Sequence, residues 1–178
     1  MVIFLFIVFI TIIFIFSSKK LSPIPYFPSQ KIDLPKIIKA LNLKNNQTVF
    51  DLGAGDGIVI FEAAKWTYKH KLNTQFIAVE INPVLILIMN IRRIFHINKN
   101  NIKIIYGDIF ELDFKNFINF TYGSVVTDPY NITFYLYISP WYLEKVIENC
   151  LHSEALAKGC KLKIENFHVV SYMYPIKS

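Results

Sequence analysis

Three acidic residues stand at the ends of three successive short apolar runs. They are Asp51, Glu80 and Asp108. Ligands of open α/β sheets bind in the crevice outside the carboxyl ends of parallel strands. A carboxylate in that crevice can accept hydrogen bonds from both cis hydroxyls of a ribose, the role expected of Glu80, while Asp108 could reach an adenine amino group. A single aspartate at the end of a strand usually only forms a turn, but an acidic residue at the end of each of three successive strands indicates a binding crevice.

A glycine-rich turn leads directly from the first run into a helix. Its residues are Gly53, Ala54, Gly55, Asp56 and Gly57. The glycines permit positive φ and allow a ligand to approach backbone N–H groups. In the dinucleotide fingerprint the third glycine would fall at Ile58, and Asp56 would repel a pyrophosphate. An acidic turn instead suits a sulfonium and an α-ammonium group, the charge pattern of S-adenosylmethionine (SAM).

Further residues are expected to complete a SAM site. Ile81 and Asn82 follow Glu80 and could flank the adenosine, and Ile109 follows Asp108. A nicotinamide dinucleotide, or a fold that no longer binds a ligand, remains the alternative. The dispersed Cys and His residues have no metal-ligand spacing, so no metal is expected.

The elements that must position these residues alternate between strands and helices. Strands are expected over 48–52, 75–80, 102–106, 124–127 and 160–165, and helices over 34–41, 58–66, 83–95 and 141–151. Such alternation predicts right-handed β-α-β units. The fold class is therefore α/β, a doubly wound, mostly parallel Rossmann-like sheet. It has a shortened C-terminal end, because little chain remains for a final hairpin.

The first residues are almost entirely apolar. Residues 1–18 are expected to form one transmembrane helix, although a 16-residue apolar run is a little short for a bilayer; a signal peptide and a buried core helix are the alternatives. Lys19 and Lys20 follow it, which predicts a single-pass membrane protein whose domain lies on the cytoplasmic or organellar-matrix side. Residues 19–30 form a Pro-rich linker, and 31–178 form the domain.

Taken together, the motifs DLGAGDG (51–57), EINP (80–83) and YGDIF (106–110) resemble those of class I SAM-dependent methyltransferases. The apolar segment followed by PYFPS (25–29) is also similar to the membrane-anchored protein-lysine methyltransferases. That family modifies the c-subunit of ATP synthase and the ADP/ATP carrier. The resemblance implies a protein substrate, in particular a membrane protein, with the bilayer bound through residues 1–18.

The acceptor site is expected after the fourth strand, where Asp128 and Tyr130 are the candidate catalytic residues. Asp128-Pro129-Tyr130 is similar to the D/N-P-P-Y motif of amino-group methyltransferases, with one Pro fewer. The formal net charge of +6 is scattered along the chain, which argues against nucleic acid as partner. The leading expectation is thus methylation of a protein lysine. A small hydrophobic or lipid acceptor, and a catalytically inactive SAM-binding or assembly module, are the alternatives.

Overall fold

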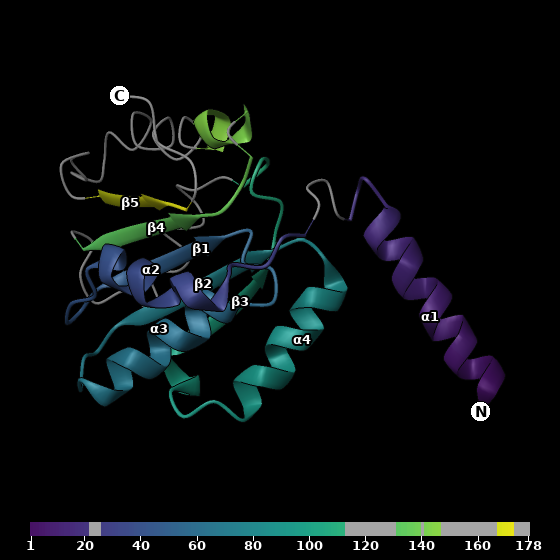
Figure 1. Ribbon diagram of the computed structural model, residues 1–178, viewed down its shortest axis with the longest axis horizontal. Helices are drawn as coiled ribbons and strands as arrows, with labels where there is room; N and C mark the ends of the chain where they lie inside the picture. Colours follow the sequence, from purple (N-terminus) through teal and green to yellow (C-terminus); the bar gives the residue numbers. More distant parts are fainter. Residues whose placement is uncertain (22–25, 113–130, 140, 147–166, 173–178) are drawn as a thin grey trace.

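Five parallel strands form one sheet in the order β3-β2-β1-β4-β5 (Figure 1). The computed structural model describes residues 1–21, 26–112, 131–139, 141–146 and 167–172. The strands are β1 (Thr48–Leu52), β2 (Gln75–Glu80), β3 (Ile102–Tyr106), β4 (Ile132–Leu136) and β5 (Phe167–Ser171). The chain order reverses direction at β1, where β2 pairs on one side and β4 on the other. This is the switch point at which α/β sheets bind ligands.

Two apolar cores sandwich the sheet. Alternate residues of a strand point to opposite faces, so Val49 joins one core and Phe50 the other. All five residues of β1 are buried, as expected of a central parallel strand covered on both faces. One face packs against α2 (Leu34–Leu41), α3 (Ile58–Lys69) and α4 (Pro83–Ile94). The other face packs against a helical turn at residues 141–146 through Leu143 and Val146.

The residues that precede α3 and α4 explain where these helices begin. Gly57 precedes α3 in a left-handed conformation, with φ +75°. Asn82 caps α4, because its side-chain oxygen accepts hydrogen bonds from the amides of Val84 and Leu85, and Pro83 occupies the first turn. Short 3₁₀ turns, η1 (Lys31–Asp33) and η2 (Lys99–Asn101), precede α2 and β3. The glycine turn is thus held between a buried strand and a helix.

The α/β architecture with a parallel sheet is confirmed, and the first three strands have the predicted bounds. The sheet continues through a different segment, because the strand beside β1 is Ile132–Leu136. Its neighbour β5 runs parallel to it rather than as part of an antiparallel hairpin. The predicted strands at 124–127 and 160–165 lie outside the described residues. β4 was not predicted; its sequence, ITFYL, is rich in aromatic residues and follows the segment where the fourth strand was expected.

The N-terminal helix α1 (Val2–Ser17) projects from the domain beside α4 (Figure 1). At about 1.5 Å per residue its 16 residues extend about 24 Å, whereas a bilayer core is about 30 Å thick. Within the described part of the chain, no helix combines the length and apolar character needed to span a membrane. The predicted transmembrane anchor, its bilayer partner and the single-pass membrane localisation are therefore wrong.

Candidate cofactor and acceptor site

An open cavity lies at the carboxyl ends of β1, β2, β3 and β4, and the space between its walls, open solvent included, is about 790 Å³. Nine of the eleven residues predicted from the sequence as cofactor-binding line it. They are Asp51, Gly53, Ala54, Gly55, Asp56, Glu80, Ile81, Asp108 and Ile109. The motifs that are dispersed in sequence therefore converge on one hollow.

The glycine turn has the backbone that its sequence predicts. Gly53 and Gly55 have φ values of +81° and +59°, and the amides of Gly53 and Ala54 donate to the carbonyl of Val79. These bonds hold the turn against β2. A Cβ on Gly53 would lie in ordinary van der Waals contact with Ile109 and Ile138, 3.9 Å from each, so no close contact requires glycine at this position and its positive φ does. A Cβ on Gly55 would instead lie 2.8 Å from the ring of Tyr26.

Glu80 connects the glycine turn to the start of α4. One of its carboxylate oxygens accepts from the amide of Gly55 at 2.7 Å, and the other from the amides of Ile81 and Asn82 at 3.0 and 2.9 Å. Burial raises the pKa of the Glu80 carboxyl, and the three amides partly offset that rise. The carboxylate therefore has a structural task besides any contact with ribose, and its unused lone pairs remain available to a ligand.

Asp51 is the most deeply buried acid of the cavity. It is 2% exposed and lies in register with Ala78 of β2 and Tyr135 of β4. Burial raises the pKa of its carboxyl well above the usual value, and the charges of Glu80 and Asp56 raise it further. A cationic ligand beside this carboxylate would relieve both effects.

Asp56 is engaged with protein groups. Its carboxylate lies 2.7 Å from the guanidinium of Arg92 on α4 and accepts from the amide of Ile58 at 3.3 Å. Arg92 also donates to the Asp56 carbonyl at 2.8 Å. The hydroxyl of Tyr26 bonds to Asp56 as well, and burial together with this charge raises the pKa of Tyr26 to about 12. The negative charge of Asp56 is therefore largely balanced within the protein.

Asp108 shapes the turn that follows β3. Its side chain accepts from the amide of Phe110 at 2.8 Å, and its carbonyl accepts from Glu111 at 3.1 Å. Ile109 is buried against the core beneath the cavity. The turn presents Asp108 to the cavity while fixing the direction of Phe110, which also lines it.

Two predicted cofactor residues do not line the cavity. Gly57 is the residue before α3, where a Cβ would lie 2.8 Å from the Phe61 ring, so its glycine serves helix packing. Asn82 is 1% exposed and caps α4. The predicted catalytic residues Asp128 and Tyr130 lie outside the described residues. No cluster of potential metal ligands occurs in the part of the chain that the structure describes.

Sequence reasoning did not assign several residues that line the cavity. Tyr26, Phe27 and Ser29 belong to the segment predicted as a linker, yet they form one wall. The hydroxyl of Ser29 lies 3.1 Å from that of Tyr135, which fastens this segment to β4. The PYFPS sequence was the available signal, because prolines restrict a segment that carries two aromatic rings. Tyr135, Tyr137 and Ile138, at the end of β4, also line the cavity.

A sequence model of the family described as ribosomal RNA adenine dimethylase matches residues 26–155. The match covers most of the chain and includes every cavity-lining residue from Tyr26 to Ile138. This chain belongs to that family. No curated protein matches it by sequence.

Solved structures share the fold. An RNA methyltransferase from Salinibacter ruber, in complex with S-adenosyl-L-homocysteine, matches with TM-score 0.56 and 19% identity over 82% of this chain and 76% of that one. A precorrin-6y C5,15-methyltransferase from Geobacter metallireducens GS-15 matches with TM-score 0.55 and 18% identity over 85% and 65%. The 23S rRNA methyltransferase ErmE matches with TM-score 0.54 and 16% identity over 83% and 48%, so this chain spans about half of its length. At these identities the matches show the fold alone.

The protein is a SAM-dependent methyltransferase with S-adenosylmethionine as its cofactor. The cavity fits this cofactor. Buried carboxylates at Asp51 and Glu80 face the hollow, as a ligand carrying a sulfonium and an ammonium group requires. Gly53 has no side chain, so the space that a Cβ would occupy in this turn stays free.

The family overturns the predicted partners. It is described by dimethylation of adenine in ribosomal RNA, which contradicts a protein substrate and also the argument against nucleic acid. The physical error lies in the charge argument. Cations that are scattered along a sequence can still gather on one folded surface, so their spacing in the chain does not exclude nucleic acid.

Proposed function

We propose that this member of the ribosomal RNA adenine dimethylase family transfers methyl groups from SAM to the exocyclic amine of an adenine in RNA. The observation that carries the proposal is the extent of the family match. It spans 26–155 and so contains the whole described cavity, from the Tyr26 segment to the residues after β4. The family model therefore matches all the residues that line the cavity, and not the glycine turn alone.

The cavity offers distinct walls to cofactor and acceptor. Its acidic part, at Asp51 and Glu80, would hold the cofactor, which supplies a methyl group activated by its positive sulfur. Its apolar part contains the aromatic side chains of Phe110 and Tyr137 and the aliphatic side chain of Ile138, from the turn after β3 and the segment after β4. An unpaired purine binds well between aromatic and aliphatic side chains. We therefore place the adenine at this wall.

Methylation of an adenine amine needs alignment more than strong acid–base catalysis. A carbon–nitrogen bond forms, the carbon–sulfur bond breaks, and the nitrogen loses one proton. The enzyme's main task is to hold the amine in line and to exclude water. The buried side chains of Tyr135 and Ile138 line the cavity and would help to exclude water.

The test is transfer of radiolabelled methyl from SAM into separated RNA, protein and lipid fractions. Label is expected in RNA and, after digestion, in N6-methylated adenosine. Asp51→Asn is the matched control, because it preserves shape while removing the buried charge and should strongly reduce transfer. Label in protein, as methyl-lysine, or in lipid would refute an RNA acceptor. Cofactor binding without label in any fraction would favour an inactive SAM-binding module.

A further inference from the structure

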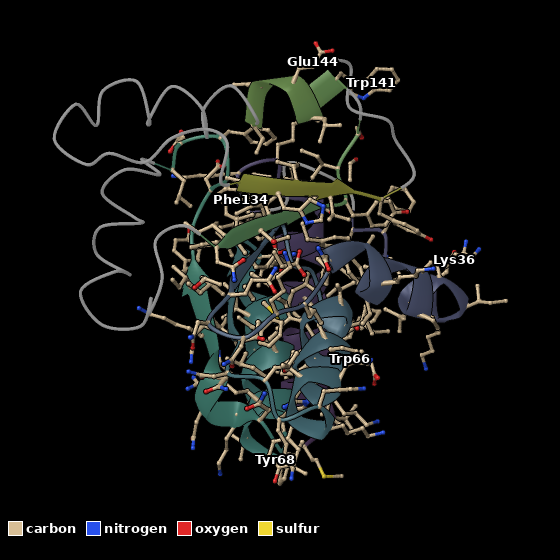
Figure 2. All side chains as sticks on the ribbon, turned by 90° about the vertical axis from the view of Figure 1, so that its left-hand side faces the viewer. Lys36, Trp66, Tyr68, Phe134, Trp141 and Glu144 are labelled. Carbon is tan, nitrogen blue, oxygen red and sulfur yellow. The ribbon has the colours of Figure 1, made fainter. Side chains whose placement is uncertain are left out.

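The helical turn at 141–146 has one buried and one exposed side. Leu143 and Val146 are anchored in the core, and the amides of Tyr142 and Leu143 both donate to the carbonyl of Ser139. On the outer side, Trp141 is 79% exposed and Tyr142 39% exposed. Figure 2 shows Trp141 and Glu144 projecting outward from this turn. A tryptophan so exposed on a well-anchored turn lacks a packing explanation.

These aromatic side chains continue into the cavity wall. The ring of Tyr142 lies 5.2 Å from that of Phe110, at an interplanar angle of 56°. The ammonium of Lys145 lies 5.3 Å from the centre of the same Phe110 ring. Phe110 itself lines the cavity. Trp141 and Lys145 are four residues apart and hence share a face of the turn. We call these four residues the aromatic platform: Trp141, Tyr142, Lys145 and Phe110.

The composition of the platform matches one class of ligand. Proteins bind unpaired nucleotides by stacking bases on aromatic rings and placing cations near the phosphates. An adenine in a duplex cannot reach an enclosed site, so an enzyme acts on an unpaired or extruded base. The nucleotides flanking that base must then leave the cavity along its aromatic wall. At this wall the structure presents exposed rings and an ammonium.

We propose that the aromatic platform binds the unpaired nucleotides that flank the target adenine. This inference rests on the proposed RNA acceptor and adds a preference for single-stranded RNA, with Trp141 as the outermost stacking residue. Glu144 is the one acidic group of this short turn, and its charge would weaken binding of the phosphates.

The chain provides its own reporter for the test, because it has two tryptophans on different elements. Trp66 stacks on His70 in α3, while Trp141 lies on the platform. Adenine-containing single-stranded oligoribonucleotides should quench the fluorescence of Trp66→Phe, in which Trp141 is the reporter. The quenching should be absent in Trp141→Phe. A duplex of the same sequence should bind more weakly.

Affinity measurements test the energetic part of the proposal. Trp141→Ala should weaken single-strand binding by roughly 5- to 150-fold, the range of one stacked base. Lys145→Gln should reduce the slope of log affinity against log salt by about 0.7, the value of one phosphate contact. Glu144→Gln should bind RNA at least as tightly as the parent protein. Binding of S-adenosylhomocysteine, measured by calorimetry, should be unchanged in all three and shows that each variant is folded.

The outcomes separate the two proposals. If RNA is methylated and Trp141→Ala binds and methylates it as well as the parent does, the platform is wrong and the acceptor stands. Equal affinity for duplex and single strand would likewise overturn the platform. If the parent protein neither binds nor methylates RNA, both proposals fail.

Discussion

The amide of Gly55 donates a 2.7 Å hydrogen bond to the carboxylate of Glu80, a residue 25 positions further along the chain. The same carboxylate accepts from Ile81 and Asn82, so one side chain positions both the glycine turn and the start of α4. This contact ties together the two sequence motifs that meet in the cofactor cavity. Because Glu80 also lines the cavity, a change at this residue can alter stability as well as the predicted cofactor contact.

Substitution of Glu80 should therefore affect folding as well as cofactor affinity. Glu80→Ala leaves three backbone donors without their acceptor, two of them in buried bonds, and should lower the free energy of unfolding by about 2 to 4 kcal/mol. Glu80→Gln keeps an acceptor oxygen and should cost less. Urea denaturation gives the stability, and calorimetry gives S-adenosylhomocysteine binding. Equal stability of Glu80→Ala and the parent would contradict the structural role.

The two glycines of the cavity wall should respond differently to alanine. Gly55→Ala would hold alanine at a positive φ and would also place its Cβ 2.8 Å from the Tyr26 ring, whereas Gly53→Ala would only hold alanine at a positive φ. The positive φ alone costs about 1 to 2 kcal/mol of stability. Gly55→Ala should be the more destabilising, and Tyr26→Ala in the same chain should remove the excess. If Tyr26→Ala does not relieve the destabilisation by Gly55→Ala, the Tyr26 ring does not occupy the space that a Cβ on Gly55 needs.

Asp51 should make stability depend on pH. The folded state raises the pKa of its carboxyl above the ordinary value of 3.8, so its favourable contribution is complete below that value. The contribution is lost as pH rises through the folded-state pKa. Glu80, whose pKa is also raised, adds in the same direction. Stability should thus fall as pH rises from acid toward neutral, and less so in Asp51→Asn, as measured by urea denaturation at a series of pH values.

Cofactor affinity should show the opposite trend. A cation beside Asp51 favours the ionised carboxylate, so binding of SAM should tighten over the same pH range. Asp51→Asn should bind more weakly and with a smaller dependence on pH. Calorimetric titration at each pH provides the measurement. A parent affinity that falls as pH rises would show that Asp51 does not face the positive charge.

The hydroxyl pair Ser29–Tyr135 should show coupling in a double-mutant cycle. The two hydroxyl oxygens are 3.1 Å apart and buried, so Ser29→Ala or Tyr135→Phe alone leaves the other hydroxyl without this hydrogen-bond partner. Each single variant should lose about 1 to 2 kcal/mol of stability, and the double variant less than the sum. Strict additivity would mean that this contact does not fasten the Tyr26–Ser29 segment to the sheet.

Local patterns were sufficient for the first three strands and for most of the residues that line the cavity. Apolar and β-branched runs defined β1, β2 and β3. In β1 and β2 the run is nearly continuous because these parallel strands are buried, whereas β3 at the edge of the sheet is only partly buried. Spacing of glycine and acid then predicted the cavity wall from Asp51 to Gly55. The ITFYL strand was not predicted. All five of its residues are buried, and a short run without alternation of exposed and buried positions does not identify a strand by its periodicity.

By itself the sequence determined the parallel α/β framework and the cofactor class, because backbone propensity and the chemistry of the glycine turn are local properties. Only the tertiary structure decided which side chains share the cavity. It showed that Asp56 is balanced by Arg92 on a distant helix, that Gly57 and Asn82 serve helix ends, and that the Tyr26 segment forms a wall. Charge pairing, packing and the convergence of remote segments depend on three-dimensional proximity. Spacing along the chain does not encode that proximity.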